Sequence, residues 1–132
     1  MGNSFRCITN NPLVKERGFW ELEYYDTDVL GLFHLVKSEV EAGYKLLTHP
    51  LSGSIRPDIT PYKTVLLSAR AEKERDGESE GLIEKAIRYA GDLYGLREVP
   101  VYKRWNDAAK KDFQLVDLSI IERALEVAQM NR

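Results

Sequence analysis

The spacing of hydrophobic and polar residues changes several times along the chain, and each change predicts a new element. Short runs that alternate in polarity, or that are rich in β-branched and aromatic residues, predict strands. These runs lie at 5–9, 19–25, 44–48, 63–68 and 113–116. Spacings of three and four between apolar residues predict helices at about 28–42, 80–94 and 118–129.

Each of the three main predicted helices carries an apolar stripe. The stripe of the first consists of Val29, Leu32, Phe33, Val36 and Val40. Those of the later two are Leu82, Ile83, Ala86, Ile87, Ala90 and Leu93, and Ile120, Ile121, Ala124, Leu125 and Ala128. A brief helix is predicted at 13–17, with Asn11 as its N-cap, Pro12 at its first position and Gly18 at its end. Residues 99–106 are expected to be irregular.

Strands that alternate with helices indicate an α/β fold. We expect a single layered domain over residues 1–132, with a mainly parallel sheet of about five strands flanked by three main helices. The order of the strands does not follow from the pattern.

Composition narrows the class of protein. The chain is 43% hydrophobic and 30% charged, with a net charge of -2, so it has no general attraction to nucleic acid or membranes. No apolar run approaches the roughly 20 residues that span a bilayer, and the start lacks the pattern of a signal peptide. Cys7 is the single cysteine, so no internal disulfide forms. We therefore expect a cytoplasmic protein with neither a nucleic-acid nor a membrane partner.

The polar loop after residues 44–48 carries most of the candidate chemistry. In an α/β domain, ligands bind beyond the carboxyl ends of parallel strands. A glycine between two serines exposes backbone N–H groups to an anion, and an arginine adds a two-pronged contact. The candidate ligand-binding residues are Thr48, His49, Ser52, Gly53, Ser54 and Arg56. An ordered structural loop, stiffened by Pro50 and Pro57, is the alternative interpretation.

The turn at Asn10 and Asn11 is the second candidate for ligand binding, because it follows the first strand and opens a helix. Parallel neighbours end on the same edge of a sheet, so we expect one of these asparagines within roughly 10 Å of residues 48–54. Capping and turn chemistry is an equally good explanation of both residues.

Several functional classes lose support. The sequence has no dinucleotide-binding or P-loop glycine motif. His34 fits a structural histidine beside an apolar stripe, and Cys7 an inert core thiol. Two separated histidines and one distant cysteine do not form a metal site, so no metal is expected. Basic and aromatic residues mix over 97–105, but this short stretch fits a solvated loop better than a nucleic-acid site. No cofactor can be assigned.

Two segments resemble the GrdX family: Ile8–Val14, which reads ITNNPLV, and Leu46–Ser54, which reads LLTHPLSGS. Tyr62-Lys63 after Thr60-Pro61 fits the same pattern, and the resemblance extends over Ile8–Leu67. Members of this family are small bacterial proteins encoded with the glycine, sarcosine and betaine reductase systems of amino-acid-fermenting anaerobes. The resemblance implies an accessory role in regulation, assembly or maturation, with reductase components as partners. It carries over no catalytic residue.

Two hypotheses follow. In the first, the chain is an accessory protein that binds a small anionic ligand or a protein partner at the Thr48–Arg56 loop. In the second, it is a small enzyme in which His49 is a general acid or base and Ser52, Ser54 or Arg56 holds an anionic substrate. A homo-oligomer is compatible with both.

Overall fold

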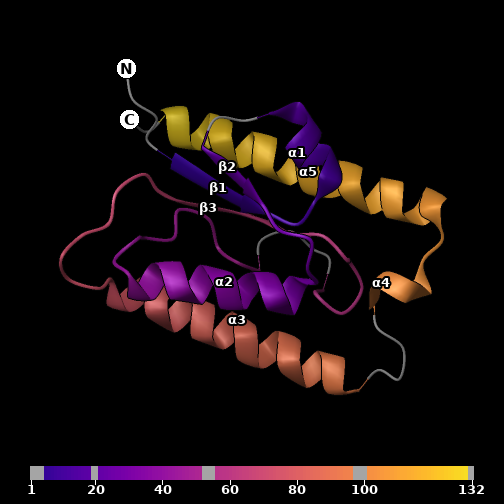
Figure 1. Ribbon diagram of the computed structural model, residues 1–132, viewed down its shortest axis with the longest axis horizontal. Helices are drawn as coiled ribbons and strands as arrows, with labels where there is room; N and C mark the ends of the chain where they lie inside the picture. The colour runs from indigo at the N-terminus through magenta and orange to yellow at the C-terminus, as the bar shows by residue number, and fades with distance from the viewer. Residues whose placement is uncertain (1–4, 19–20, 52–55, 97–100, 131–132) are drawn as a thin grey trace.

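A small mixed sheet lies at the centre of the fold (Figure 1), in a computed structural model that describes residues 5–18, 21–51, 56–96 and 101–130. The sheet has three strands in the order β2-β1-β3. They are β1 (Phe5–Thr9), β2 (Leu22–Tyr24) and β3 (Thr64–Ser68). β1 pairs with β2 in parallel and with β3 antiparallel, so the carboxyl ends of β1 and β2 share an edge with the start of β3.

Helices cover both faces of the sheet, which makes the fold α/β as expected. Figure 1 shows α1 and α5 on one face and α2 and α3 on the other. The helices are α1 (Pro12–Arg17), α2 (Val29–Glu41), α3 (Gly77–Gly95), α4 (Val101–Arg104) and α5 (Asp107–Met130). Among the described residues, none of them is long and apolar enough to cross a membrane.

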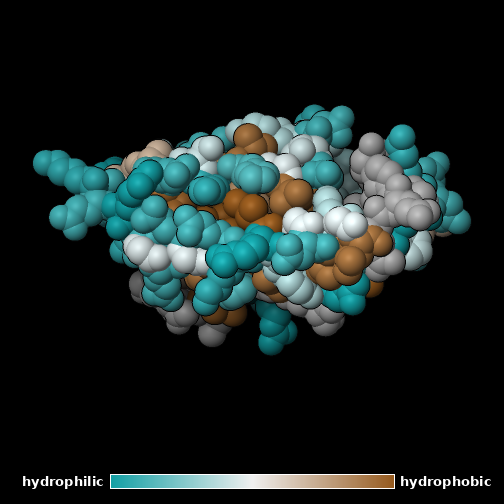
Figure 2. Space-filling view, turned by 90° about the horizontal axis from the view of Figure 1, so that it is seen from below, coloured by the Kyte–Doolittle hydropathy of each residue, from teal (hydrophilic) through white to brown (hydrophobic). Residues whose placement is uncertain are grey.

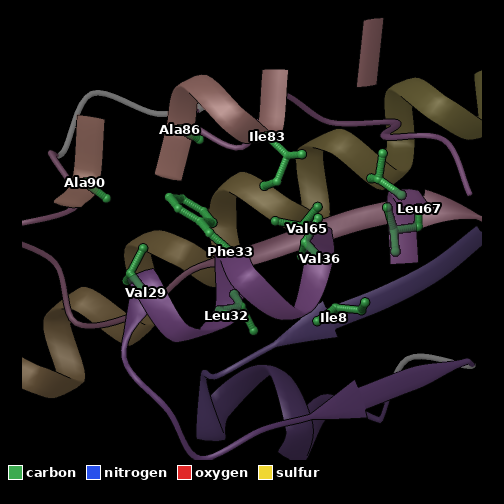
Figure 3. Close-up of a cluster of buried hydrophobic side chains, with 11 residues drawn as sticks. Ile8, Val29, Leu32, Phe33, Val36, Val65, Leu67, Ile83, Ala86 and Ala90 are labelled. Atoms are coloured by element: carbon green, nitrogen blue, oxygen red, sulfur yellow. The ribbon is translucent and has the colours of Figure 1, made fainter. Parts of the chain in front are cut away.

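The face covered by α2 and α3 carries the larger of the two hydrophobic cores of the described residues. Figure 3 shows Phe33 and Val36 of α2 directed into the same space as Ile83 and Ala86 of α3. All five predicted stripe residues of α2 are buried, which confirms that part of the prediction. The buried cluster consists of Ile8, Val29, Leu32, Phe33, Val36, Val40, Val65, Leu67, Ile83, Ala86 and Ala90.

The face covered by α1 and α5 carries a second core. α1 begins as predicted: the side chain of Asn11 accepts a hydrogen bond from the N–H of Leu13, and Pro12 stands at the first position. Gly18 closes the helix with a left-handed φ of 66°, a conformation in which glycine carries no steric penalty. The buried cluster consists of Phe5, Cys7, Val14, Leu66, Leu118, Ile121 and Leu125.

The prediction of a mainly parallel sheet of about five strands is wrong. The 44–48 segment is not a strand, because only Leu46 forms an isolated bridge, to Leu67. The Thr48 hydroxyl, in place of a backbone carbonyl, accepts from the Leu66 N–H, at 3.1 Å. Of the predicted second strand, only Leu22–Tyr24 is a strand, and Phe19 and Trp20 lie outside the described residues.

The 113–116 segment is also not a strand, because it lies within the long helix α5. Its apolar residues do not mark a buried strand: Leu115 is 54% exposed and Val116 is 41% exposed. The residues of α5 that reach the core come later, at Leu118, Ile121 and Leu125. Residues 101–104, expected to be irregular, form the short helix α4.

The outer surface on the side of α3 is mainly hydrophilic. Figure 2, seen from below, shows hydrophobic side chains in separate groups between hydrophilic ones. On α3, the apolar residues Leu82 and Ile87 are half-buried, and Tyr89 is exposed. A concave site lies elsewhere, at an edge of the sheet.

Candidate functional site

A cleft of about 420 Å³ opens at the carboxyl ends of β1 and β2. This is where ligands bind in open α/β sheets, and the volume lies in the usual range of small-molecule sites. The cleft takes residues from both helix layers, since Asp28 precedes α2 and Lys110 belongs to α5. Its lining consists of Asn10, Pro12, Tyr24, Asp26, Thr27, Asp28, Pro61, Tyr62 and Lys110.

Asn10 builds this cleft by joining the segments around it. Its side-chain amide donates to the backbone carbonyls of Thr27, at 2.8 Å, and Pro61, at 2.9 Å. Its oxygen accepts from the backbone N–H of Lys63 at 2.8 Å. The side chain is buried, and both of its amide hydrogens are used. Asn10 therefore fixes the walls of the cleft and has no amide hydrogen left to donate to a ligand.

The wall before α2 carries two carboxylates. Asp28 caps α2, since its Oδ1 accepts from the Gly31 N–H at 2.7 Å. Asp26 is exposed and makes no hydrogen bond or ion pair with the described residues. Thr27 lies between them, and a Cβ at Gly31 would stand 2.0 Å from its hydroxyl oxygen. Glycine at position 31 therefore lets the Thr27 side chain pack against the first turn of α2.

Two tyrosines complete the lining. Burial raises the pKa of Tyr24, and the neighbouring Asp26 and Tyr62 raise it further, so the hydroxyl stays protonated at neutral pH. The Tyr62 hydroxyl accepts from the Gln114 side chain of α5 at 3.1 Å. The ring of Tyr24 also contacts a cation, because the Lys15 ammonium lies 4.8 Å from the ring centroid.

Asn11 points away from the cleft into a buried polar cluster. The Asp117 carboxylate accepts from the Asn11 amide, at 3.0 Å, and from the Thr64 hydroxyl, at 2.7 Å. The Asn11 amide also donates to the backbone carbonyl of Gln114, at 3.0 Å. Burial raises the pKa of Asp117, although these hydrogen bonds and the charge of Lys63 oppose the shift. Asn11 therefore holds α5 against the sheet.

The described polar groups of the 48–56 loop largely contact the protein itself. Thr48 accepts from the backbone of β3, as described above. His49 is exposed, and its Nδ1 accepts from the Leu51 N–H at 3.1 Å. The exposed Arg56 pairs with the buried Asp58 through two contacts, at 3.0 and 2.7 Å. Ser52, Gly53 and Ser54 lie outside the described residues.

The end of this loop is held by the chain around α4. The Arg104 guanidinium donates to the backbone carbonyl of Asp58, and the Trp105 indole donates to that of Ile59 at 2.8 Å. Of the predicted site residues, Asn10 lines the cleft, whereas Asn11, Thr48, His49 and Arg56 do not. Within the described residues, the two candidate regions are thus separate sets of side chains.

The family model for GrdX-like proteins matches residues 6–126 of this chain. The chain belongs to the GrdX-like family. The match confirms the resemblance and extends it, because it takes in α3 and most of α5 as well as the first half of the chain. No curated protein and no solved structure matches.

His34 and Cys7 of this GrdX-like chain are not among the residues that line the cleft. His34 is exposed on α2. Cys7 is buried in β1, and burial raises the pKa of its thiol to about 12. Among the described residues, no group of His, Cys, Asp and Glu side chains could hold a metal ion.

Sequence reasoning missed most of the cleft. It identified Asn10 at the end of β1 but not the residues that follow β2. The same rule, that polar residues beyond a parallel strand mark a site, identifies Asp26, Thr27 and Asp28 after Tyr24. Lys110 had no such signal, because the start of α5 was not predicted.

Proposed function

We propose that this GrdX-like protein is an accessory component of a glycine- or betaine-reductase type of system and binds a small ligand in the cleft beyond β1 and β2. Family membership suggests the association with such a system. The cleft, with its lining drawn from both helix layers, is the observation that carries the ligand-binding part. A ligand bound there would contact both the β2–α2 connection and α5. Its binding would therefore depend on how these two parts of the fold are placed relative to each other.

The lining favours binding over catalysis. Its described titratable groups are two carboxylates, two phenols and one ammonium, with no histidine or cysteine among them. The Tyr24 phenol has a raised pKa, which makes it a hydrogen-bond donor and a poor base at neutral pH. Such a set orients a ligand by charge and hydrogen bonding.

The accessory role can be tested with purified components. Isotope-labelled protein is titrated with each reductase component while its backbone amide resonances are followed by NMR. We expect saturable shifts with at least one component, and a change in reductase turnover when the protein is added to the reconstituted system. Unchanged spectra together with unchanged turnover would contradict the role.

The Thr48–Arg56 loop is a second candidate, for an anion or a protein partner. The supporting observation is the exposed His49, whose Nδ1 accepts from Leu51, so that a neutral ring carries its proton on Nε2. An anion at Arg56 has to compete with Asp58. Phosphate titration at two pH values tests this site: binding should be tighter at the lower pH, His49→Ala should reduce the pH dependence, and Arg56→Ala should weaken binding throughout.

The same loop carries the enzymatic alternative, in which His49 transfers a proton to or from an anionic substrate. That alternative predicts turnover that is lost in His49→Ala while phosphate still binds. The accessory role predicts that phosphate or partner binding at the loop is unaccompanied by any reaction.

A further inference from the structure

We infer that the cleft beyond β1 and β2 is selective for a small organic cation, a molecule carrying a primary or methylated ammonium group. This inference rests on the proposed function and adds the chemical class of the ligand. Its basis is the joint presence of a carboxylate wall and two phenol rings around one concave site.

The charge of the lining favours a cation. Among the described lining side chains, Asp26 and Asp28 contribute two negative charges and Lys110 one positive charge, which leaves a net charge of -1. Asp28 uses Oδ1 to cap α2, and Oδ2 has no hydrogen bond to the described residues. Asp26 has no ion-pair partner among them either. An entering ammonium group therefore meets carboxylate oxygens that the protein has not already neutralised.

The aromatic lining favours the same ligand. Phenol rings attract cations through the negative potential of their faces, and tyrosines with carboxylates form the cages that bind methylated ammonium groups. Tyr24 already behaves this way toward the Lys15 ammonium, which is not part of the lining. Tyr62 is held by Gln114 of α5, so its ring is positioned before a ligand arrives.

The described lining of the cleft offers few groups that could bind an anion. The amide hydrogens of Asn10 are both used by backbone carbonyls, and Lys110 is the single cationic side chain of the described lining. The cleft and the His49 loop are thus expected to differ in the sign of the ligand that they select. This difference makes the charge of a probe the decisive variable.

The test uses probes of similar size and different charge. Tetramethylammonium and methylammonium chlorides, the neutral tert-butanol, and sodium acetate are each titrated into isotope-labelled protein at constant ionic strength. We expect saturable NMR shifts at cleft residues with the ammonium probes and weaker or absent shifts with the other two. The affinity for ammonium should fall as the salt concentration rises, because exposed charges are screened.

Charge variants then locate the site. Asp26→Asn and Asp28→Asn should each weaken ammonium binding roughly fivefold, the scale of one partly exposed ion pair. Asparagine is a good N-cap, so Asp28→Asn keeps α2 capped. Lys110→Gln should tighten binding by roughly twofold, since it removes a like charge. Asp92→Asn, an exposed site on α3 outside the lining, is the matched control and should leave the affinity unchanged.

The possible failures are distinguishable. If tert-butanol or acetate binds the cleft as well as the ammonium probes, or if the aspartate variants bind like the parent, the cation assignment is overturned while a ligand-binding cleft stands. If no probe of any charge shifts cleft residues at concentrations of about 100 mM, at which even very weak binding is detected, the ligand-binding part of the proposed function fails with it.

Discussion

The two faces of the sheet are held together in different ways. On the α2/α3 face lies the larger hydrophobic cluster of the described residues, with Phe33 among its largest side chains. On the α1/α5 face, the apolar cluster stands beside a buried carboxylate, Asp117, which joins Thr64 of β3 to Asn11 at the start of α1. The stability of the first face depends mainly on the packing of apolar side chains. The stability of the second depends also on the hydrogen bonds of its buried carboxylate.

This difference predicts which substitutions on each face should lower the stability of the protein most. An apolar core loses stability in proportion to the volume that is removed. A buried polar group is expensive when one partner is lost and much less so when both are replaced together. The two faces should therefore respond differently to single and paired substitutions.

The largest effect is expected on the apolar face. Phe33→Ala removes a ring that is fully buried between α2, α3 and the sheet, and should lower the free energy of unfolding by about 3–5 kcal/mol. Urea unfolding followed by circular dichroism measures this loss. Phe33→Leu keeps most of the volume and should recover more than half of it. A loss below about 1 kcal/mol would mean that the α2/α3 interface is not a close-packed core.

The next effect concerns the hydrogen bonds of Asp117. Asp117→Ala leaves the Thr64 hydroxyl and one Asn11 amide hydrogen without this acceptor, and should cost about 1–3 kcal/mol. Thr64→Val should then cost less in the Asp117→Ala background than in the parent, because the hydroxyl has already lost one of its partners and keeps the Thr9 hydroxyl, at 2.7 Å. A double-mutant cycle from urea unfolding measures the coupling. Strict additivity would show that the pair contributes nothing beyond its separate parts.

The sequence predicted the apolar face better than the polar one, and the reason is physical. Val29, Leu32, Phe33, Val36 and Val40 recur at helical spacing because a single surface of α2 meets the sheet. In α5, the core residues Leu118, Ile121 and Leu125 are accompanied by the exposed Leu115 and Val116. The run at 113–116 therefore has the composition of a strand although it belongs to a long helix.

The third strand was predicted wrongly for a related reason. Residues 44–48 have β-forming side chains and do lie against β3, but the Thr48 hydroxyl accepts the hydrogen bond from Leu66. When a side chain replaces a backbone carbonyl as the acceptor of a strand hydrogen bond, the spacing of hydrophobic residues does not change, so the sequence pattern cannot reveal it. Without that strand, the expected reason for Asn10 or Asn11 to lie near the His49 loop, two parallel strand ends side by side, does not apply.

Only part of the candidate site could be predicted from the sequence. Asn10 stood out because it follows a clear strand, but its role in joining Thr27, Pro61 and Lys63 is a property of the tertiary structure. Lys110 enters the cleft from a helix whose start was not predicted.

The polar face should also respond to pH in a direction that the apolar face does not. Burial raises the folded-state pKa of Asp117 above the unfolded value of 3.8. Between these two values the folded state holds the proton more tightly than the unfolded state, so this group's contribution to stability falls as pH rises. The fall ends once the pH exceeds the raised pKa, and its slope is at most about 1.4 kcal/mol per pH unit.

The comparison of the parent with Asp117→Asn isolates this effect. Urea unfolding of both proteins from pH 4 to pH 7 should give a stability difference, parent minus variant, that decreases as pH rises. A difference that increases with pH would mean that the hydrogen bonds from Asn11 and Thr64, with the charge of Lys63, favour the carboxylate more than burial disfavours it.

The smallest effect is expected at the two helix caps, which form a matched pair across the sheet. Asp28 caps α2 through one bond to the Gly31 N–H, whereas Asn11 caps α1 through the Leu13 N–H and also donates to Asp117. Each substitution to alanine removes a cap worth about 1 kcal/mol. Asn11→Ala should cost about 1 kcal/mol more than Asp28→Ala, because it also removes a buried bond to a carboxylate. Thermal and urea unfolding of the two variants measure the difference. In the Asp117→Ala background the extra cost of Asn11→Ala should become smaller but not vanish, because the bond from Asn11 to the Gln114 carbonyl remains. The cost of Asp28→Ala should be the same in both backgrounds. An equal cost of Asn11→Ala in both backgrounds would mean that its bond to Asp117 adds no stability, and the two faces would then differ less than their hydrogen bonds suggest.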